Sequence, residues 1–151
     1  MALASAITAR SPRLSDALRE SARGELEGAT LAAVADDAVA AASLMAMDNV
    51  FYRFRHLIGN TDYESKPARL RMNRLVKPAG SKVDFELVCL AVSAINNCPA
   101  CVIAHEHTVL EGGLTPDHVH DAVRIAAVVN AAAVGLAAVP APISAGSAAL
   151  P

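Results

Sequence analysis

Most of the chain carries apolar residues spaced three and four positions apart, and no stretch of useful length alternates apolar with polar residues. The first pattern gives an α-helix one apolar face, whereas a half-buried strand requires alternation. About a fifth of the residues are alanine, which is the best helix former and a poor strand former. We therefore expect an all-α protein, and the pattern excludes β-sandwiches and β-barrels.

Proline and glycine divide this pattern into six expected helices. Pro12, Pro99 and Pro116 each suit the first turn of a helix, where the N–H that proline lacks has no partner to lose. Ser81 followed by Asp84 resembles a capping box that opens another helix. The expected helices cover residues 12–22, 30–57, 67–76, 82–95, 99–110 and 116–138, with a loop at 59–62 and a frayed tail after about 139.

Length and charge limit the class of protein further. The 151 residues suit one domain, which we take as 1–151, and a 54% apolar share can fill a core. A net charge of −2 argues against nucleic-acid binding, which needs clustered Lys and Arg. The N-terminus lacks the features of a secretory signal, and the apolar stretch 125–139 is shorter than the roughly twenty residues of a membrane span. We expect a cytoplasmic protein that binds no membrane.

The pattern also predicts which residues are buried. The alanine-rich helix over 116–138 is apolar all round, so we expect it to be buried, partly between subunits. Asp36, Asp37 and the basic run 69–77 are expected to be solvated. One face of the helix over 30–57 is expected in the core and consists of Val34, Ala38, Ala41 and Met45.

One segment combines residues that carry chemistry. Cys98 and Cys101 are separated by two residues at an expected helix start, a spacing that can close a disulfide with little backbone movement. A helix N-terminus and a nearby imidazole both stabilise a thiolate. Cys101 and His105 are four residues apart and share one helix face, which suits an activated thiol beside a base. Three cysteines are an odd number for a disulfide scaffold and suit a reducing compartment.

Glu86 precedes Cys98 by twelve residues. In one straight helix the two would lie about 18 Å apart and could not cooperate. A turn at Asn96-Asn97 instead folds two helices into a hairpin and brings Glu86 to the height of His105. We infer that Glu86 orients His105 or exchanges a proton with it, and that any link to the thiols passes through His105 or a water.

Other interpretations of these residues remain open. Cys98 and Cys101 are also compatible with inert packing, or with half of a zinc site that includes His105 and lacks an evident fourth ligand. Cys89 lies between apolar residues and is expected in the core. Three further histidines are expected at the surface: His107, His118 and His120.

Longer strings around these residues resemble the AhpD-type alkyl hydroperoxide reductases of the carboxymuconolactone decarboxylase-like superfamily. The resemblance extends from about residue 3 to about residue 138, and typical members are longer at the N-terminus, so we expect one helix fewer here. The strings that carry it are Met47-Asp48-Asn49-Val50-Phe51-Tyr52-Arg53, Leu70-Arg71-Met72-Asn73, Asp84-Phe85-Glu86-Leu87, Ala91-Val92-Ser93-Ala94-Ile95-Asn96 and Ala104-His105-Glu106-His107-Thr108.

The resemblance implies a single-domain AhpD-like helical bundle, a homotrimer, and an antioxidant thiol peroxidase that reduces organic hydroperoxides. It makes Cys101 the peroxidatic cysteine, which the hydroperoxide oxidises to a sulfenic acid. It makes Cys98 the resolving cysteine and proton donor, which closes a disulfide with Cys101. Glu86 and His105 would form the proton relay. No bound cofactor or metal is implied.

The resemblance also implies partners. The disulfide would be reduced by a dihydrolipoyl group on the lipoyl domain of a 2-oxoacid dehydrogenase complex, and the protein would serve as a reductant for the peroxiredoxin AhpC. The sequence departs from the best-known members at Ala100, where they carry a histidine that helps hold a thiolate. Two alternatives stay open: a dithiol adaptor that passes electrons to a peroxiredoxin and reacts poorly with peroxide, and a carboxymuconolactone decarboxylase, whose chemistry needs no dithiol.

Overall fold

The computed structural model describes residues 1–139, and these form eight α-helices without a strand. The all-α prediction is confirmed, whereas the expected frayed tail falls on residues 140–151, outside the described residues. The helices are α1 (Ala2–Thr8), α2 (Pro12–Glu25), α3 (Gly28–Ile58), α4 (Thr61–Glu64), α5 (Asn73–Val76), α6 (Lys82–Ile95), α7 (Pro99–Glu111) and α8 (Pro116–Ala138).

The helix starts follow the predicted signals. Helices α2, α7 and α8 each begin with proline in the first turn. The Ser81 hydroxyl accepts a hydrogen bond from the Asp84 N–H at 3.3 Å and so caps α6. Helix α3 ends at Gly59, whose φ of +55° is left-handed and strained for a residue with a Cβ. Short-range sequence signals therefore fix the main helix boundaries.

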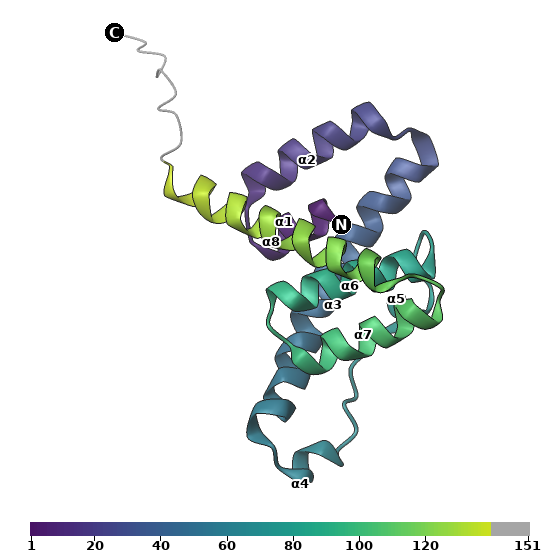
Figure 1. Cartoon of the computed structure of the whole chain (residues 1–151), viewed down its shortest axis with the longest axis vertical. Coiled ribbons are helices and arrows are strands. Elements are labelled where there is room, and N and C mark those ends of the chain that lie inside the picture. Colours follow the sequence, from purple (N-terminus) through teal and green to yellow (C-terminus); the bar gives the residue numbers. More distant parts are fainter. Residues whose placement is uncertain (140–151) are drawn as a thin grey trace, which may run out of the picture.

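The core lies where α1, α3 and α6 meet. Small residues let these helices approach closely, and Met45 and Phe85 fill the space between them. Figure 1 shows α3 as a long helix that runs from the turn after α2 down to α4, with α6 and α7 against its middle. The buried cluster consists of Ala4, Ala38, Ala41, Met45, Phe85, Cys89 and Val92. Helix α1, which contributes Ala4, was not among the expected helices.

Two local predictions were wrong. The expected helix over 67–76 is reduced to α5, because Arg69 adopts a left-handed φ of +52° that cannot continue a helix. Val34, predicted in the core, is 43% exposed. In addition, the short helix α4 forms within the segment expected to be a loop, where the Asn60 side chain accepts a hydrogen bond from the Asp62 N–H at 2.9 Å.

Asp37 is buried rather than solvated. Its carboxylate accepts hydrogen bonds from the N–H groups of Ala79 and Gly80, both at 2.8 Å, and from Arg74 Nη2 at 3.0 Å. Arg74 also pairs with the exposed Asp36, so the basic run is not simply a solvated face. These bonds tie the loop before α6 to α3.

Helix α8 is less buried than its composition suggested. Only Ala122, Ala126 and Ala133 are buried, because α8 contacts α1, α2 and α6 along one face, while Val128 and Val134 are 69% and 65% exposed. By length and hydropathy both α3 and α8 could cross a membrane, which corrects the length argument made for residues 125–139. Core helices of soluble proteins pass the same test, so this is weak evidence for a membrane.

Candidate active site

The turn between α6 and α7 carries the first cysteine of the pair. Asn96 ends α6, and Asn97 has a left-handed φ of +55°, which asparagine tolerates better than most residues. The Cys98 N–H then donates a hydrogen bond to the Ser93 carbonyl at 3.1 Å. The predicted turn at Asn96-Asn97 is therefore confirmed, and it folds α6 and α7 into a hairpin.

A hydrogen-bond network from α3 fixes this turn, and sequence reasoning missed it. The Asn49 side chain is almost fully buried; it donates to Ser93 Oγ at 2.9 Å and accepts from Asn96 Nδ2 at 2.9 Å. Arg53 Nη1 donates to the Asn96 carbonyl at 2.7 Å. These bonds hold the end of α6, and the Cys98 N–H bonds the Ser93 carbonyl, so α3 helps to position Cys98 through α6.

The two cysteines lie at the N-terminus of α7 with their sulfur atoms at disulfide distance and their Cα atoms 5.4 Å apart. Cys98 is the residue that precedes the helix, and Cys101 lies in its first turn. Cys98 is fully buried, whereas Cys101 is 6% exposed. The structure thus brings the pair together as the spacing predicted, and Cys101 is the more exposed residue of the two.

Glu86 and His105 form a buried pair across the hairpin. Glu86 Oε2 lies 2.6 Å from His105 Nδ1, and both residues are less than 10% exposed. The predicted proximity of Glu86 to His105 is confirmed. His105 Nε2 lies 3.2 Å from the Met45 sulfur, and within the described residues neither ring nitrogen bonds a cysteine. Any proton that moves between His105 and the thiols must therefore cross the space between them.

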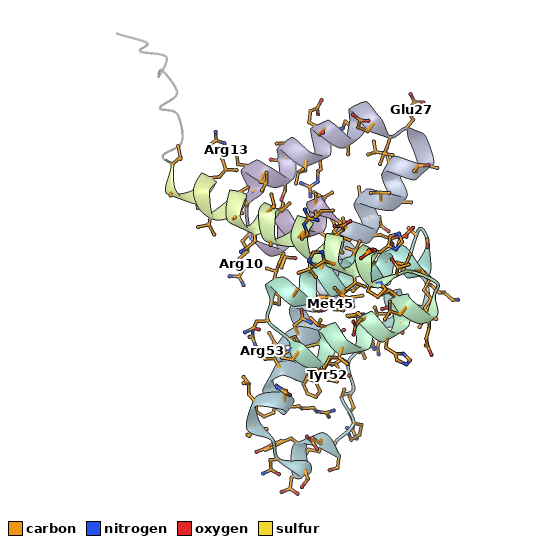
Figure 2. The ribbon with its side chains drawn as sticks, viewed as in Figure 1. Arg10, Arg13, Glu27, Met45, Tyr52 and Arg53 are labelled. Carbon is orange, nitrogen blue, oxygen red and sulfur yellow. A yellow bond between two sulfur atoms is a disulfide. The ribbon has the colours of Figure 1, made fainter. Side chains whose placement is uncertain are left out.

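A cavity of about 220 Å³ lies on the side of α7 that carries Cys101 and His105. Its wall comes from α3, α7 and the segment before α6, and its lining is mainly apolar. Met45 and Tyr52 lie on the second half of α3 and are labelled beside α7 in Figure 2. The lining residues are Met45, Asp48, Tyr52, Met72, Leu75, Ala100, Cys101, Ala104 and His105. This arrangement can hold a small apolar molecule against the Cys101 sulfur; Cys98 does not line the cavity.

Asp48 also lines this cavity, and sequence reasoning did not predict it. It is 3% exposed, and its Oδ1 atom has no hydrogen-bond partner among the described residues. Burial raises the pKa of the Asp48 carboxyl, while the charge of His105 opposes that rise. A signal was present in the sequence, since Asp48 follows the predicted core residue Met45 by three positions and so falls on the apolar face.

The other candidate residues lie away from this cavity. Cys89 is fully buried, as predicted, and its pKa is raised by burial and further by the nearby carboxylates, that of Glu86 first. Within residues 1–139 no three His, Cys, Asp or Glu side chains are grouped so as to hold a metal ion, so the zinc interpretation gains no support. His107, His118 and His120 are exposed, as predicted.

The sequence is similar to those of known proteins. The sequence pattern of the carboxymuconolactone decarboxylase family matches residues 62–142. A protein named alkyl hydroperoxide reductase AhpD from Anaeromyxobacter dehalogenans (strain 2CP-C) is 60% identical over 136 residues, which cover 90% of this chain and 71% of that protein. Another of the same name, from Bradyrhizobium sp. (strain BTAi1 / ATCC BAA-1182), is 46% identical over 145 residues, which cover 95% of this chain and 78% of that protein.

Proposed function

Since the chain belongs to the carboxymuconolactone decarboxylase family, with close relatives named AhpD, we propose that it is an alkyl hydroperoxide reductase that works through a dithiol/disulfide cycle. One observation carries this proposal. Cys101 lines an apolar cavity together with His105, while Cys98 lies buried behind it at disulfide distance. A peroxide in the cavity meets one sulfur first, and the second sulfur is already in place.

The first step is oxidation of Cys101. Its thiolate attacks the terminal oxygen of an organic hydroperoxide, the O–O bond breaks, and Cys101 becomes a sulfenic acid while an alkoxide leaves and takes up a proton. The position of Cys101 in the first turn of α7 supports this role, because the N-terminus of a helix stabilises a thiolate. The apolar lining from Met45, Met72 and Leu75 favours organic hydroperoxides as substrates.

The second step is resolution by Cys98. Its sulfur attacks the sulfenic sulfur of Cys101, the S–O bond breaks, and a disulfide forms. In this proposal Glu86 and His105 accept the Cys98 proton through a water and return it to the departing hydroxide, so that water is released. The 2.6 Å contact between Glu86 and His105 supports the relay, because the carboxylate orients the ring.

The third step restores the dithiol. A dihydrolipoyl group supplies two electrons: one of its thiolates attacks the Cys98–Cys101 disulfide, its second thiol completes the exchange, and both cysteines regain protons. The lipoyl domain of a 2-oxoacid dehydrogenase complex is the proposed carrier, and AhpC is a proposed acceptor of the same electrons. No bound cofactor takes part in this cycle.

Association and location belong to the same proposal. We infer a homotrimer in the cytoplasm. The exposed apolar side chains of α8, Ile125, Val128 and Val134, support burial of this helix between subunits, because large apolar patches on a free chain usually mark interfaces. Sedimentation that finds a stable monomer would contradict the trimer while leaving the chemistry of the dithiol unaffected.

The test combines reduced protein with cumene hydroperoxide and dihydrolipoamide in the absence of any partner. We expect rapid peroxide consumption, which Cys101→Ser abolishes. Cys98→Ser should form a sulfenic acid that dimedone traps but that does not turn over. The matched control is Cys89→Ser, which changes the third, buried cysteine and should leave turnover per folded molecule intact. Turnover that survives Cys101→Ser would contradict the assignment of the peroxidatic cysteine.

A dithiol adaptor is the second candidate, and Ala100 favours it. Ala100 lines the cavity beside Cys101 at the position where the best-known AhpD sequences carry a histidine, so one group that would stabilise the thiolate is missing. An adaptor would leave peroxide unconsumed in the same assay until AhpC is added. If no peroxide is consumed with or without AhpC, the result would instead favour a decarboxylase.

A further inference from the structure

We propose that Asp48 is a further catalytic residue, whose neutral carboxyl donates the proton that the alkoxide takes up when Cys101 reduces an organic hydroperoxide. This inference rests on the function proposed above and assigns a group to a step that Glu86 and His105 leave open. It concerns the oxidation of Cys101, whereas the Glu86–His105 pair serves the attack by Cys98.

The surroundings of Asp48 favour the protonated form of its carboxyl. The residue is 3% exposed, and Oδ1 lies out of contact with solvent without a hydrogen-bond donor among the described residues. A charged carboxylate in such a place loses the hydration of Oδ1 and gains no hydrogen bond there in return, so the neutral form is favoured. Burial raises the pKa of Asp48 for this reason, although the charge of His105 opposes it.

The position of Asp48 places it opposite the reactive sulfur. Asp48 lines the same cavity as Cys101, from the α3 wall that faces α7. Its neighbours on that wall, Met45 and Tyr52, are three and four residues away and therefore lie on the same face of α3. A hydroperoxide held between the two walls has Cys101 on one side and the Asp48 carboxyl on the other.

His105 is less well placed to supply this proton. Its Nδ1 is engaged by Glu86 at 2.6 Å, and its Nε2 lies 3.2 Å from the Met45 sulfur. Among the residues that line the cavity, Asp48 is the only carboxyl. We therefore assign proton transfer in the oxidation of Cys101 to Asp48, and proton transfer in the attack by Cys98 to the Glu86–His105 pair.

The step balances with Asp48 as the donor. The Cys101 thiolate attacks the terminal peroxide oxygen, the O–O bond breaks, and the sulfur is oxidised to a sulfenic acid. The electron pair of the broken bond stays on the alkoxide oxygen, which takes the Asp48 proton and leaves as an alcohol. The Asp48 carboxylate then regains a proton from solvent before the next turnover.

The leaving group provides the test. Sulfenic acid formation is measured by quenched dimedone trapping and mass spectrometry in the Cys98→Ser background, where the product accumulates. Two oxidants are compared: cumene hydroperoxide, whose alkoxide needs a proton, and peroxyacetic acid, whose carboxylate leaving group does not. Asp48→Ala should slow the first reaction about 10²-fold, in the range of general acid catalysis, and leave the second unchanged.

Asp48→Asn refines this result. The amide keeps a hydrogen-bond donor of nearly the same shape but has no proton to give, so we expect a loss of about 10-fold with cumene hydroperoxide alone. The matched control is Asp36→Asn, an exposed aspartate of the same helix, which should react as the Cys98→Ser parent does.

Several outcomes would overturn the inference. An equal loss with both oxidants would show that Asp48 only shapes the cavity, and no loss with cumene hydroperoxide would show that it plays no part. Failure of the proposed function is visible separately, because the parent with Asp48 intact would then form no sulfenic acid with either oxidant, and the inference would fail with it.

Discussion

Helix α3 buries two aspartates, Asp37 and Asp48, about three helical turns apart. Their hydrogen-bond environments are opposite. The Asp37 carboxylate accepts hydrogen bonds from two backbone N–H groups and from Arg74. The Asp48 carboxyl lines an apolar cavity, and its buried oxygen has no donor within the described residues. The same residue type on one helix therefore serves two different purposes.

The hydrogen-bond partners of a buried aspartate indicate its role in this protein. Hydrogen bonds that satisfy a carboxylate fix the loop before α6, so the Asp37 region contributes to stability. A carboxyl that lacks donors is a local conflict, and proteins retain such conflicts where chemistry requires them. The contrast assigns Asp37 to folding and Asp48 to the active site, and each assignment can be tested separately.

The largest expected effect comes from Asp37→Ala. This change removes the acceptor of three hydrogen bonds and leaves the Ala79 and Gly80 N–H groups and part of Arg74 without a partner. We expect the free energy of unfolding, measured with urea, to fall by about 3 to 4 kcal/mol. Sulfenic acid formation per folded molecule should remain, because Asp37 does not line the active-site cavity.

Asp36→Ala is the control for that prediction. Asp36 also pairs with Arg74, but its side chain is 61% exposed, so its loss should cost about 0 to 1 kcal/mol. Comparable losses for the two variants would mean that the ion pair with Arg74, rather than the backbone hydrogen bonds, gives the Asp37 region its stability.

Asn49, the residue after Asp48, should give an intermediate effect. Asn49→Ala removes hydrogen bonds to the buried Ser93 and the half-buried Asn96 and leaves their side chains without these partners. We expect a loss of about 2 kcal/mol in urea unfolding. Disulfide formation should also slow, because the turn that carries Cys98 is less well held. Asn73→Ala, which changes an exposed asparagine, is a suitable control. If Asn49→Ala were as stable as the parent, the hydrogen bonds of Asn49 would not be what stabilises the turn.

Sequence reasoning predicted the features that depend on short-range signals. Helix starts at Pro99 and Pro116, the turn at Asn96-Asn97 and the approach of Glu86 to His105 all follow from residue types at fixed spacings. The family resemblance was confirmed as well. These features need no knowledge of which helices pack together beyond one hairpin.

The two buried aspartates that sequence reasoning missed depend on contacts between distant segments. Asp37 was expected in solvent because its donors, at Arg74 and at Ala79 and Gly80, lie some forty residues away in the chain. Asp48 stood inside a matching family string, yet its burial depends on where α7 packs against α3. Helical spacing shows which residues share a face and leaves open what that face meets.

A smaller effect is expected on the pH dependence of stability. The pKa of Asp48 is raised in the folded state, so folding is favoured while the carboxyl is protonated, and that contribution is lost as pH rises through the folded pKa. Asp48→Asn removes this titration. Relative to the parent, its unfolding free energy should be similar near pH 4 and higher at pH 8, as measured by urea midpoints. A difference that reverses sign would show that Asp48 is a stabilising anion.

The smallest effect is expected at Cys89, which is buried in the core cluster between α3 and α6. Burial raises its pKa first, and the carboxylates of Glu86 and Asp37 raise it further. The thiolate is therefore suppressed, and Cys89 should resist iodoacetamide at pH 8 in the folded protein, whereas reduced Cys101 reacts. Peptide mapping after alkylation, with urea-unfolded protein as the positive control, measures both sites. Labelling of Cys89 at the rate of Cys101 would show that the α3–α6 interface opens readily to solvent. The Asp37 region would then be no more protected from solvent than the Asp48 region.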